Sequence, residues 1–147
     1  MTDPFDLDRF VDAQAPVYAS VLAELRRGRK QSHWMWFVFP QFAGLGLSPM
    51  SQRFALRSRE EAMAYLGHGV LGPRLRECTA LVNAVGGRTI HDILGSPDDL
   101  KFHSSMTLFA AVSSEPEFAA AIAKYYGGTP DRKTLALLTA DATARRE

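Results

Sequence analysis

The chain has 147 residues, the usual length of one domain and enough to bury a hydrophobic core. Seventeen lysines and arginines nearly balance sixteen aspartates and glutamates, so no global field attracts nucleic acid or a membrane surface. The one cysteine, Cys78, excludes an internal disulfide and a cysteine-rich zinc site. The acidic start of the chain also lacks the apolar segment of a signal peptide, so we expect a cytoplasmic protein.

In the first half of the chain, the spacing of apolar residues predicts short helices over residues 4–15, 18–25 and 49–56. Asp3 and Pro4 are typical of a helix start, and Pro16 ends that helix. The apolar run 34–39 must be buried, but it is too short to be assigned to a helical turn or a strand by periodicity. The Gly-Leu-Gly-Leu-Ser run at 44–48 predicts a turn, because no Lys-Ser or Lys-Thr follows it as in a phosphate loop.

In the second half, the signals for helix starts are clearer. Ser58 and Glu61 have the spacing of a capping box, and Thr89 is another N-cap residue. Pro97, followed by two aspartates, predicts the start of a long helix. The helices predicted here cover residues 59–66, 71–85, 90–94, 97–112, 115–126 and 131–138. The alanine-rich tail 139–147 is expected to fray.

No window shows the alternation of apolar and polar residues that marks strands, and there is no repeat or linker. We therefore predict one compact all-α domain over residues 1–147, with its core between about 5 and 138. It should contain about seven short helices and no substantial sheet.

The stretch from Arg29 to Ser48 holds both tryptophans and is the first candidate for a functional site. Polar side chains, His33 and Gln41, stand at the edges of its apolar block. The basic cluster before it consists of Arg26, Arg27, Arg29 and Lys30. These cations can neutralise a helix C-terminus, or they can form an anion-binding edge.

The segment Lys101-Phe-His-Ser-Ser-Met-Thr107 is the second candidate. Lys101, Ser104 and Ser105 share a helix face, and Thr107 lies on the same turn. The hydroxyls can bond back to helix carbonyls, they can hold an anion together with the lysine, or a serine and the lysine can form a nucleophile pair. The four histidines have no metal-binding spacing, so no metal site is predicted.

Several motifs resemble a bacterial family, domain of unknown function 1810. They are Gly28-Arg-Lys-Gln-Ser-His-Trp-Met-Trp-Phe-Val-Phe-Pro-Gln41, Gly44-Leu-Gly46, His68-Gly-Val-Leu-Gly-Pro-Arg-Leu75 and Lys101-Phe-His-Ser-Ser-Met-Thr-Leu-Phe109. The resemblance runs from about Leu7 to Leu138 and implies a compact all-helical cytosolic domain without an established reaction. Members are often labelled calpastatin, but that inhibitor is a disordered repeat protein, and this chain has the apolar content of a packed domain. Gly69 departs from the proline expected there.

We therefore predict a pocket for a small anionic, nucleotide-like ligand. Its ligand-binding residues would be Lys30, Trp34, Trp36, Gln41, Lys101, Ser104, Ser105 and Thr107. One of the indoles would stack on a flat ring, and His33 would be the general acid or base if the ligand is turned over. The sequence names no cofactor and no oligomeric state, and it disfavours nucleic acid and membranes as partners. The alternatives are a protein-interaction module with an aromatic groove, and a purely structural role for both motifs.

Overall fold

The computed structural model describes residues 3–146 and contains ten helices and no strand in that range, so the protein is all-α as predicted. The helices are α1 (Asp8–Gln14), α2 (Tyr18–Arg26), α3 (Met35–Val38), α4 (Pro49–Arg53), α5 (Arg59–Gly67), α6 (Leu71–Ala84), α7 (Ile90–Leu94), α8 (Asp98–Val112), α9 (Pro116–Tyr125) and α10 (Arg132–Arg146). The number exceeds the expected seven, and three of the ten, α3, α4 and α7, have only four or five residues.

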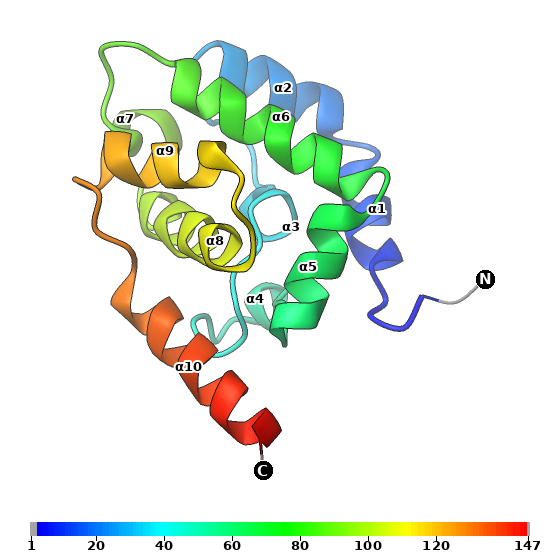
Figure 1. The fold of residues 1–147 in the computed structure, drawn as a ribbon. Coiled ribbons are helices and arrows are strands. Elements are labelled where there is room, and N and C mark those ends of the chain that lie inside the picture. Colours follow the sequence, from blue (N-terminus) through cyan, green and yellow to red (C-terminus); the bar gives the residue numbers. More distant parts are fainter. Residues whose placement is uncertain (1–2, 147) are drawn as a thin grey trace.

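Helix α8 lies in the middle of the domain, where it contacts α5, α7, α9 and α10 (Figure 1). Helices α2 and α6 run side by side along the top of the view, and α9 lies between α6 and α8. Helix α10 leaves the body at the bottom of the view and contacts α8. This arrangement covers α8 on several sides, which explains why most of its residues between 102 and 109 are buried.

The apolar block 34–39 forms the single-turn helix α3 and its flanks, which settles the alternative between helix and strand. Gln14 fixes this turn, since its amide donates to the Phe37 carbonyl at 2.6 Å and to the Tyr65 hydroxyl at 3.0 Å. Phe39 meets Phe102 of α8 edge to face, with ring centres 4.9 Å apart. The first candidate segment is therefore packed directly against the helix that carries the second.

Three predicted helix boundaries are wrong. Helix α4 ends at Arg53, three residues before the predicted end at Leu56. Helix α1 begins at Asp8, after a turn in which the Asp3 carboxylate accepts the backbone N–H of Leu7 at 2.8 Å and of Asp8 at 3.0 Å. Helix α10 does not end at Leu138 but continues to Arg146, because alanine and arginine in the predicted tail favour helix. Residue 147, the last of that tail, lies outside the described residues.

The predicted N-caps of α5 and α7 are confirmed, with one difference. Ser58 accepts the backbone N–H of Glu61 at 3.0 Å, and Thr89 forms a complete capping box with Asp92. The Glu61 carboxylate does not return to Ser58, however. It accepts the backbone N–H of Arg57 and pairs with Arg9 at 2.8 Å, so it ties α5 to α1.

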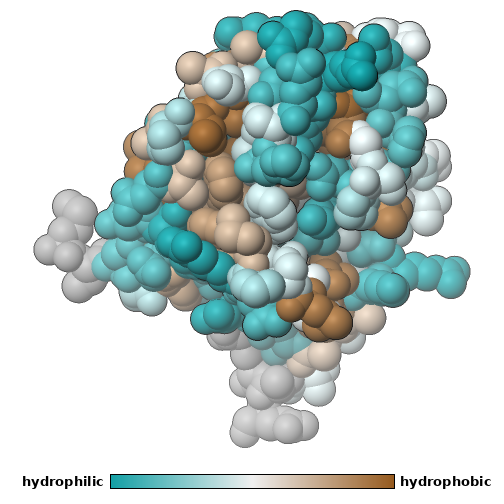
Figure 2. Space-filling view, turned by 180° about the vertical axis from the view of Figure 1, so that it is seen from behind, coloured by the Kyte–Doolittle hydropathy of each residue, from teal (hydrophilic) through white to brown (hydrophobic). Residues whose placement is uncertain are grey.

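No exposed aromatic side chain among the described residues supports an aromatic groove. The large apolar side chains that the described part of the chain exposes are Leu47, Met63, Val70, Leu100 and Leu135, none of them aromatic. Figure 2 shows the face behind that of Figure 1, on which apolar side chains form small, separate patches. No helix between residues 3 and 146 has the length and apolar character needed to cross a bilayer.

Candidate functional site

A cavity of about 580 Å³ lies where the loop after α3, the first half of α8 and the start of α10 meet. It is lined by Gln41, Leu45, Pro97, Leu100, Lys101, His103, Ser104, Thr129, Pro130, Asp131, Arg132 and Lys133. Residues from the two candidate segments, Gln41 on one side and Lys101 and Ser104 on the other, therefore face the same space. Neither segment's sequence shows this contact, because some sixty residues separate them.

The loop that carries Gln41 is held by backbone pairing and by two glycines. The Gln41 carbonyl accepts the Leu56 N–H at 2.9 Å, next to an isolated bridge between Phe42 and Leu56. Gly44 has φ +105°, a conformation that other residues avoid. A Cβ on Gly46 would lie 2.5 Å from the Ser51 side chain. The predicted turn at 44–48 is thus a structural element that sets the position of Gln41.

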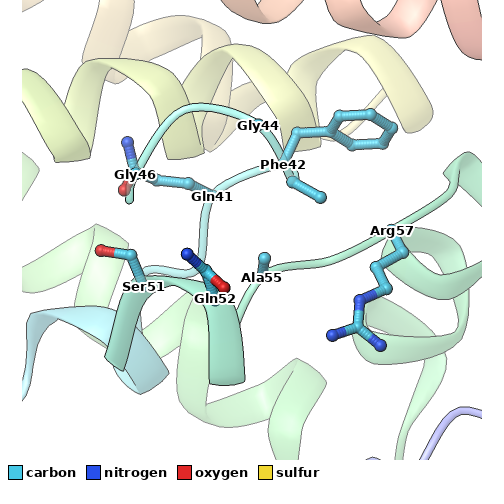
Figure 3. Close-up of a pocket in the computed structure, with 9 residues that line it drawn as sticks. Gln41, Phe42, Gly44, Gly46, Ser51, Gln52, Ala55 and Arg57 are labelled. Atoms are coloured by element: carbon cyan, nitrogen blue, oxygen red, sulfur yellow. The ribbon is translucent and has the colours of Figure 1, made fainter. Parts of the chain in front are cut away.

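A second, smaller cavity of about 210 Å³ adjoins the other side of this loop, and Gln41 lines both. In Figure 3, the side chains of Ser51 and Gln52 rise from α4 toward the loop that carries Gln41 and Gly46, and Arg57 lies across the space. The Gln52 amide is already used, since it donates to the Leu47 carbonyl at 2.8 Å. The larger cavity has more charged side chains in its wall, Lys101, Asp131, Arg132 and Lys133, against Arg57 in the smaller one.

Lys101 brings a positive charge to the larger cavity. Its ammonium lies over the Trp36 ring, 5.1 Å from the ring centre, and 3.8 Å from Asp98 Oδ1. The same aspartate makes a much closer ion pair with Lys30, at 2.9 Å. Since Lys30 already neutralises Asp98, the group of three charges keeps a net charge of +1 at Lys101. The Lys101 side chain is 21% exposed and can reach a ligand.

Ser104 and the start of α10 form the opposite wall. The Ser104 hydroxyl lies 3.2 Å from both the Leu100 carbonyl and Asp131 Oδ2. Asp131 is the N-cap of α10, since the same oxygen accepts the backbone N–H and the hydroxyl of Thr134. Arg132 and Lys133 follow it, and their side chains make no hydrogen bond or ion pair with described residues. Cations are disfavoured at a helix N-terminus, so these two are placed against the local dipole.

The histidine at the cavity is His103, whereas His33 is exposed on the turn before α3 and does not line the cavity. The His103 ring stacks on Tyr126 with centres 3.9 Å apart, and its Nε2 lies 2.7 Å from the Thr129 carbonyl. A carbonyl oxygen only accepts, so Nε2 carries the proton and Nδ1 is the free acceptor in the neutral ring. Of these two rings, only that of His103 is placed beside the cavity.

Four other predicted ligand-binding residues are used inside the protein. Trp34 is fully buried, so its ring has no face for a ligand, and that part of the prediction is wrong. Lys30 has a side chain only 6% exposed, committed to Asp98 and to the Ser32 carbonyl at 2.6 Å. Thr107 accepts the backbone N–H of Asp131 at 2.9 Å. Ser105 is buried, and its hydroxyl has no partner among the described residues.

Trp36 is the half-buried one of the two tryptophans, and its contact with the cavity residues is through Lys101. The ammonium lies over the ring, and the ring N–H is buried without a partner in the described part of the chain. The indole is not part of the cavity wall. It therefore holds Lys101 in place and does not offer a stacking surface of its own.

The arrangement does not suit a serine–lysine nucleophile pair. The Ser104 hydroxyl donates its hydrogen bond to the Leu100 carbonyl and the Asp131 carboxylate, and Ser105 is buried in the core. The ammonium of Lys101 lies beside the Asp98 carboxylate and over the Trp36 ring, and no hydrogen bond joins it to Ser104 or Ser105. Within residues 3–146 no three His, Cys, Asp or Glu side chains are grouped so as to hold a metal ion.

Sequence reasoning missed Asp98, His103, Arg132 and Lys133. Asp98 was assigned to the first turn of α8 only, and its pairing with Lys30 depends on the tertiary fold. The sequence does contain a signal for Arg132 and Lys133. Two cations directly after a helix N-cap are unfavourable for the helix, which indicates a role other than helix stability.

Comparison with known proteins gives a family and a solved structure. The family model described as "Protein of unknown function (DUF1810)" matches residues 4–138. The crystal structure of the conserved hypothetical protein Rv1873 from Mycobacterium tuberculosis is similar, with 64% sequence identity and a TM-score of 0.92. The match covers 93% of this chain and 99% of that one. No curated protein matches this chain.

Proposed function

The chain belongs to the DUF1810 family, whose description assigns no activity, and we propose from the geometry of the cavity that the protein binds a small anionic, nucleotide-like ligand. The phosphate or carboxylate end of the ligand lies among Lys101, Ser104, Arg132 and Lys133. The Gln41 amide forms hydrogen bonds with a polar edge of the ligand.

One observation carries this proposal: cations from two distant segments, α8 and α10, line the same cavity. Lys101 makes only a long ion pair of 3.8 Å with Asp98, which Lys30 contacts at 2.9 Å, and Arg132 and Lys133 have no partner among the described residues. Asp131, the one acid in the wall, is occupied by the N-cap bonds of α10. Oxyanions bind where such donors converge.

The remaining wall fits the body of a nucleotide-like molecule. Leu45, Leu100 and Pro130 supply apolar surface next to the cations, and Leu100 is 63% exposed. A flat ring resting on this surface would bury apolar area that now faces water. Ring stacking on Trp34 or Trp36, as predicted from the sequence, is replaced here by contact with aliphatic side chains.

If the ligand is turned over, His103 is the group placed to move a proton. Its Nε2–H is held by Thr129, so Nδ1 is the basic atom, and the stacked Tyr126 keeps the ring oriented. The proposal retains the cytoplasmic setting expected from the sequence.

The test is calorimetric titration with inorganic phosphate and with adenosine monophosphate, on the wild type and on Lys101→Met. The variant should weaken binding of both by at least tenfold, because it removes the central charge of the cavity. Arg53→Met removes the same charge from an exposed position at the end of α4, outside the cavity, and should leave both affinities unchanged. Absence of binding by the wild type, or equal losses in the two variants, would refute the proposal.

A further inference from the structure

The basic cluster Arg26, Arg27 and Arg29 lies far from the proposed ligand cavity. It sits at the C-terminal end of α2, beside the C-terminal end of α6, at the top of Figure 1, whereas α10 lies at the bottom. A recess of about 360 Å³ opens there between the two helix ends. Leu25, Leu81 and Val85 contribute apolar surface to it, and Arg26, Arg27 and Arg88 contribute three guanidinium groups.

The third arginine is supplied by the fold. Arg88 belongs to the segment between α6 and α7, some sixty residues after Arg26. Gly28 permits this approach, because it has φ +72° and a Cβ there would lie 3.1 Å from Val85 Cγ1. Cations from the end of α2 and from the segment after α6 therefore lie around the same recess.

These arginines are not needed to complete the helix ends. At α2, the carbonyls of Ala23, Glu24 and Leu25 accept backbone N–H groups from residues 27–29. At α6, Lys124 donates to the carbonyls of Asn83 and Val85, and the Tyr125 hydroxyl donates to that of Val82. The explanation of the cluster as hydrogen-bonding caps is therefore excluded for both helices, and only the weaker attraction to the helix dipoles remains.

The acids nearby are occupied. Glu24 is buried and accepts four hydrogen bonds from Gln31, Ser32 and Trp34. Asp92 is engaged in the capping box of α7; hydrogen bonds from Thr89 lower its pKa, and the positive charge of Arg88 lowers it to a smaller extent. No carboxylate from the described part of the chain lines the recess. Three guanidiniums outweigh the two helix C-termini, each worth about half a negative charge, so the recess is positive on balance.

We infer that this recess is a second anion-binding site, which takes a phosphate monoester. Arginine forks bind the phosphate oxygens in pairs, and the group that carries the phosphate rests on Leu81 and Val85. A free metabolite and a phosphorylated side chain share this chemistry. The inference does not depend on the proposed function of the cavity at α8 and α10.

The experiment uses the full-length protein and two probes, phenyl phosphate and a peptide with one phosphotyrosine. Binding is followed by calorimetry and by the amide NMR signals of Gly28, Gly86 and Gly87. The test variant is Arg26→Gln/Arg88→Gln, and the control is Arg53→Gln/Arg57→Gln, which removes two exposed arginines elsewhere. Lys101→Met, which disables the other cavity, serves to separate the two sites.

We expect each probe to shift the three glycine signals, and its Kd should be the same for the wild type and for Lys101→Met. The Arg26/Arg88 variant should bind at least tenfold more weakly, and the Arg53/Arg57 variant should be unchanged. The probe that binds more tightly names the source of the phosphate. Unshifted glycine signals, or equal losses in both double variants, would overturn the inference. Tighter binding of a single-stranded oligonucleotide than of either probe would also overturn it, in favour of a nucleic-acid surface.

Discussion

The indole N–H of Trp34 donates a hydrogen bond of 3.0 Å to Glu24 Oε1, ten residues earlier in the chain. The same carboxylate accepts the backbone N–H groups of Gln31 and Ser32 and, at 2.5 Å, the Ser32 hydroxyl. Burial disfavours the charge on Glu24, but hydrogen bonds from Ser32, Gln31 and Trp34 outweigh it and lower the pKa to about 2. One buried anion therefore fixes the turn that joins α2 to the aromatic block.

Glu24→Gln should lower the free energy of unfolding by about 2–4 kcal/mol at pH 7, because an amide cannot accept all four hydrogen bonds. The folded pKa of Glu24 lies below its unfolded value of 4.5, so its contribution is complete above about pH 5 and is lost as the pH falls toward 2. Urea denaturation at several pH values measures this. Asp12→Asn, an exposed control on α1, should change stability by less than about 0.5 kcal/mol. A difference between wild type and Glu24→Gln that stays constant down to pH 2.5 would contradict the assignment.

The two tryptophans should respond differently to truncation. Trp34 is fully buried, so Trp34→Ala should cost about 3–5 kcal/mol of stability. Trp36 is half-buried, and Trp36→Ala should cost clearly less while weakening phosphate binding, because Lys101 loses the ring beneath its ammonium. Chemical denaturation and phosphate titration of both variants measure these effects. Equal stability losses, or unchanged phosphate affinity in Trp36→Ala, would count against the assigned roles.

Gly72 should not tolerate a side chain. A Cβ there would lie 2.1 Å from the Leu66 carbonyl oxygen, a backbone atom that cannot move without disturbing the end of α5. Gly72→Ala should therefore destabilise the protein by about 1–3 kcal/mol. Gly86→Ala is the matched control, since nothing lies within 4 Å of its Cβ position. Thermal unfolding of the two variants compares them, and an equally stable Gly72→Ala would show that the two helices do not pack this closely.

Arg9 and Arg57 should differ although both are arginines near α5. Arg9 pairs with Glu61 and also donates to the carbonyls of Phe5, Asp6, Arg53 and Ala55. Arg9→Met should cost about 3–5 kcal/mol, because it leaves the buried Glu61 carboxylate without its partner. The Arg57 guanidinium is exposed, and Arg57→Gln should change stability by less than about 0.5 kcal/mol. Urea denaturation distinguishes the two, and similar losses would refute this description.

Local sequence patterns predicted the fold class, two helix N-caps and the burial of the aromatic block. The all-α fold, the N-caps at Ser58 and Thr89, and burial of the run 34–39 follow from periodicity and capping chemistry, which act over a few residues. The predicted end of α10 at Leu138 is wrong, because the alanine and arginine residues that follow it favour helix. The start of α1 was missed because Asp3 caps a turn before the helix.

The cavity depended on contacts that no local pattern encodes. Sequence placed Gln41, Lys101 and Ser104 among the candidates by their chemistry, and the fold brought them to one space together with Arg132 and Lys133. The ion pair between Lys30 and Asp98 and the full burial of Trp34 could not be predicted from the sequence. Both depend on how α3 packs against α8. Covalent neighbours therefore determined the helices and the kinds of side chain available. Tertiary packing decided which charges are neutralised inside the protein and which remain free for a ligand.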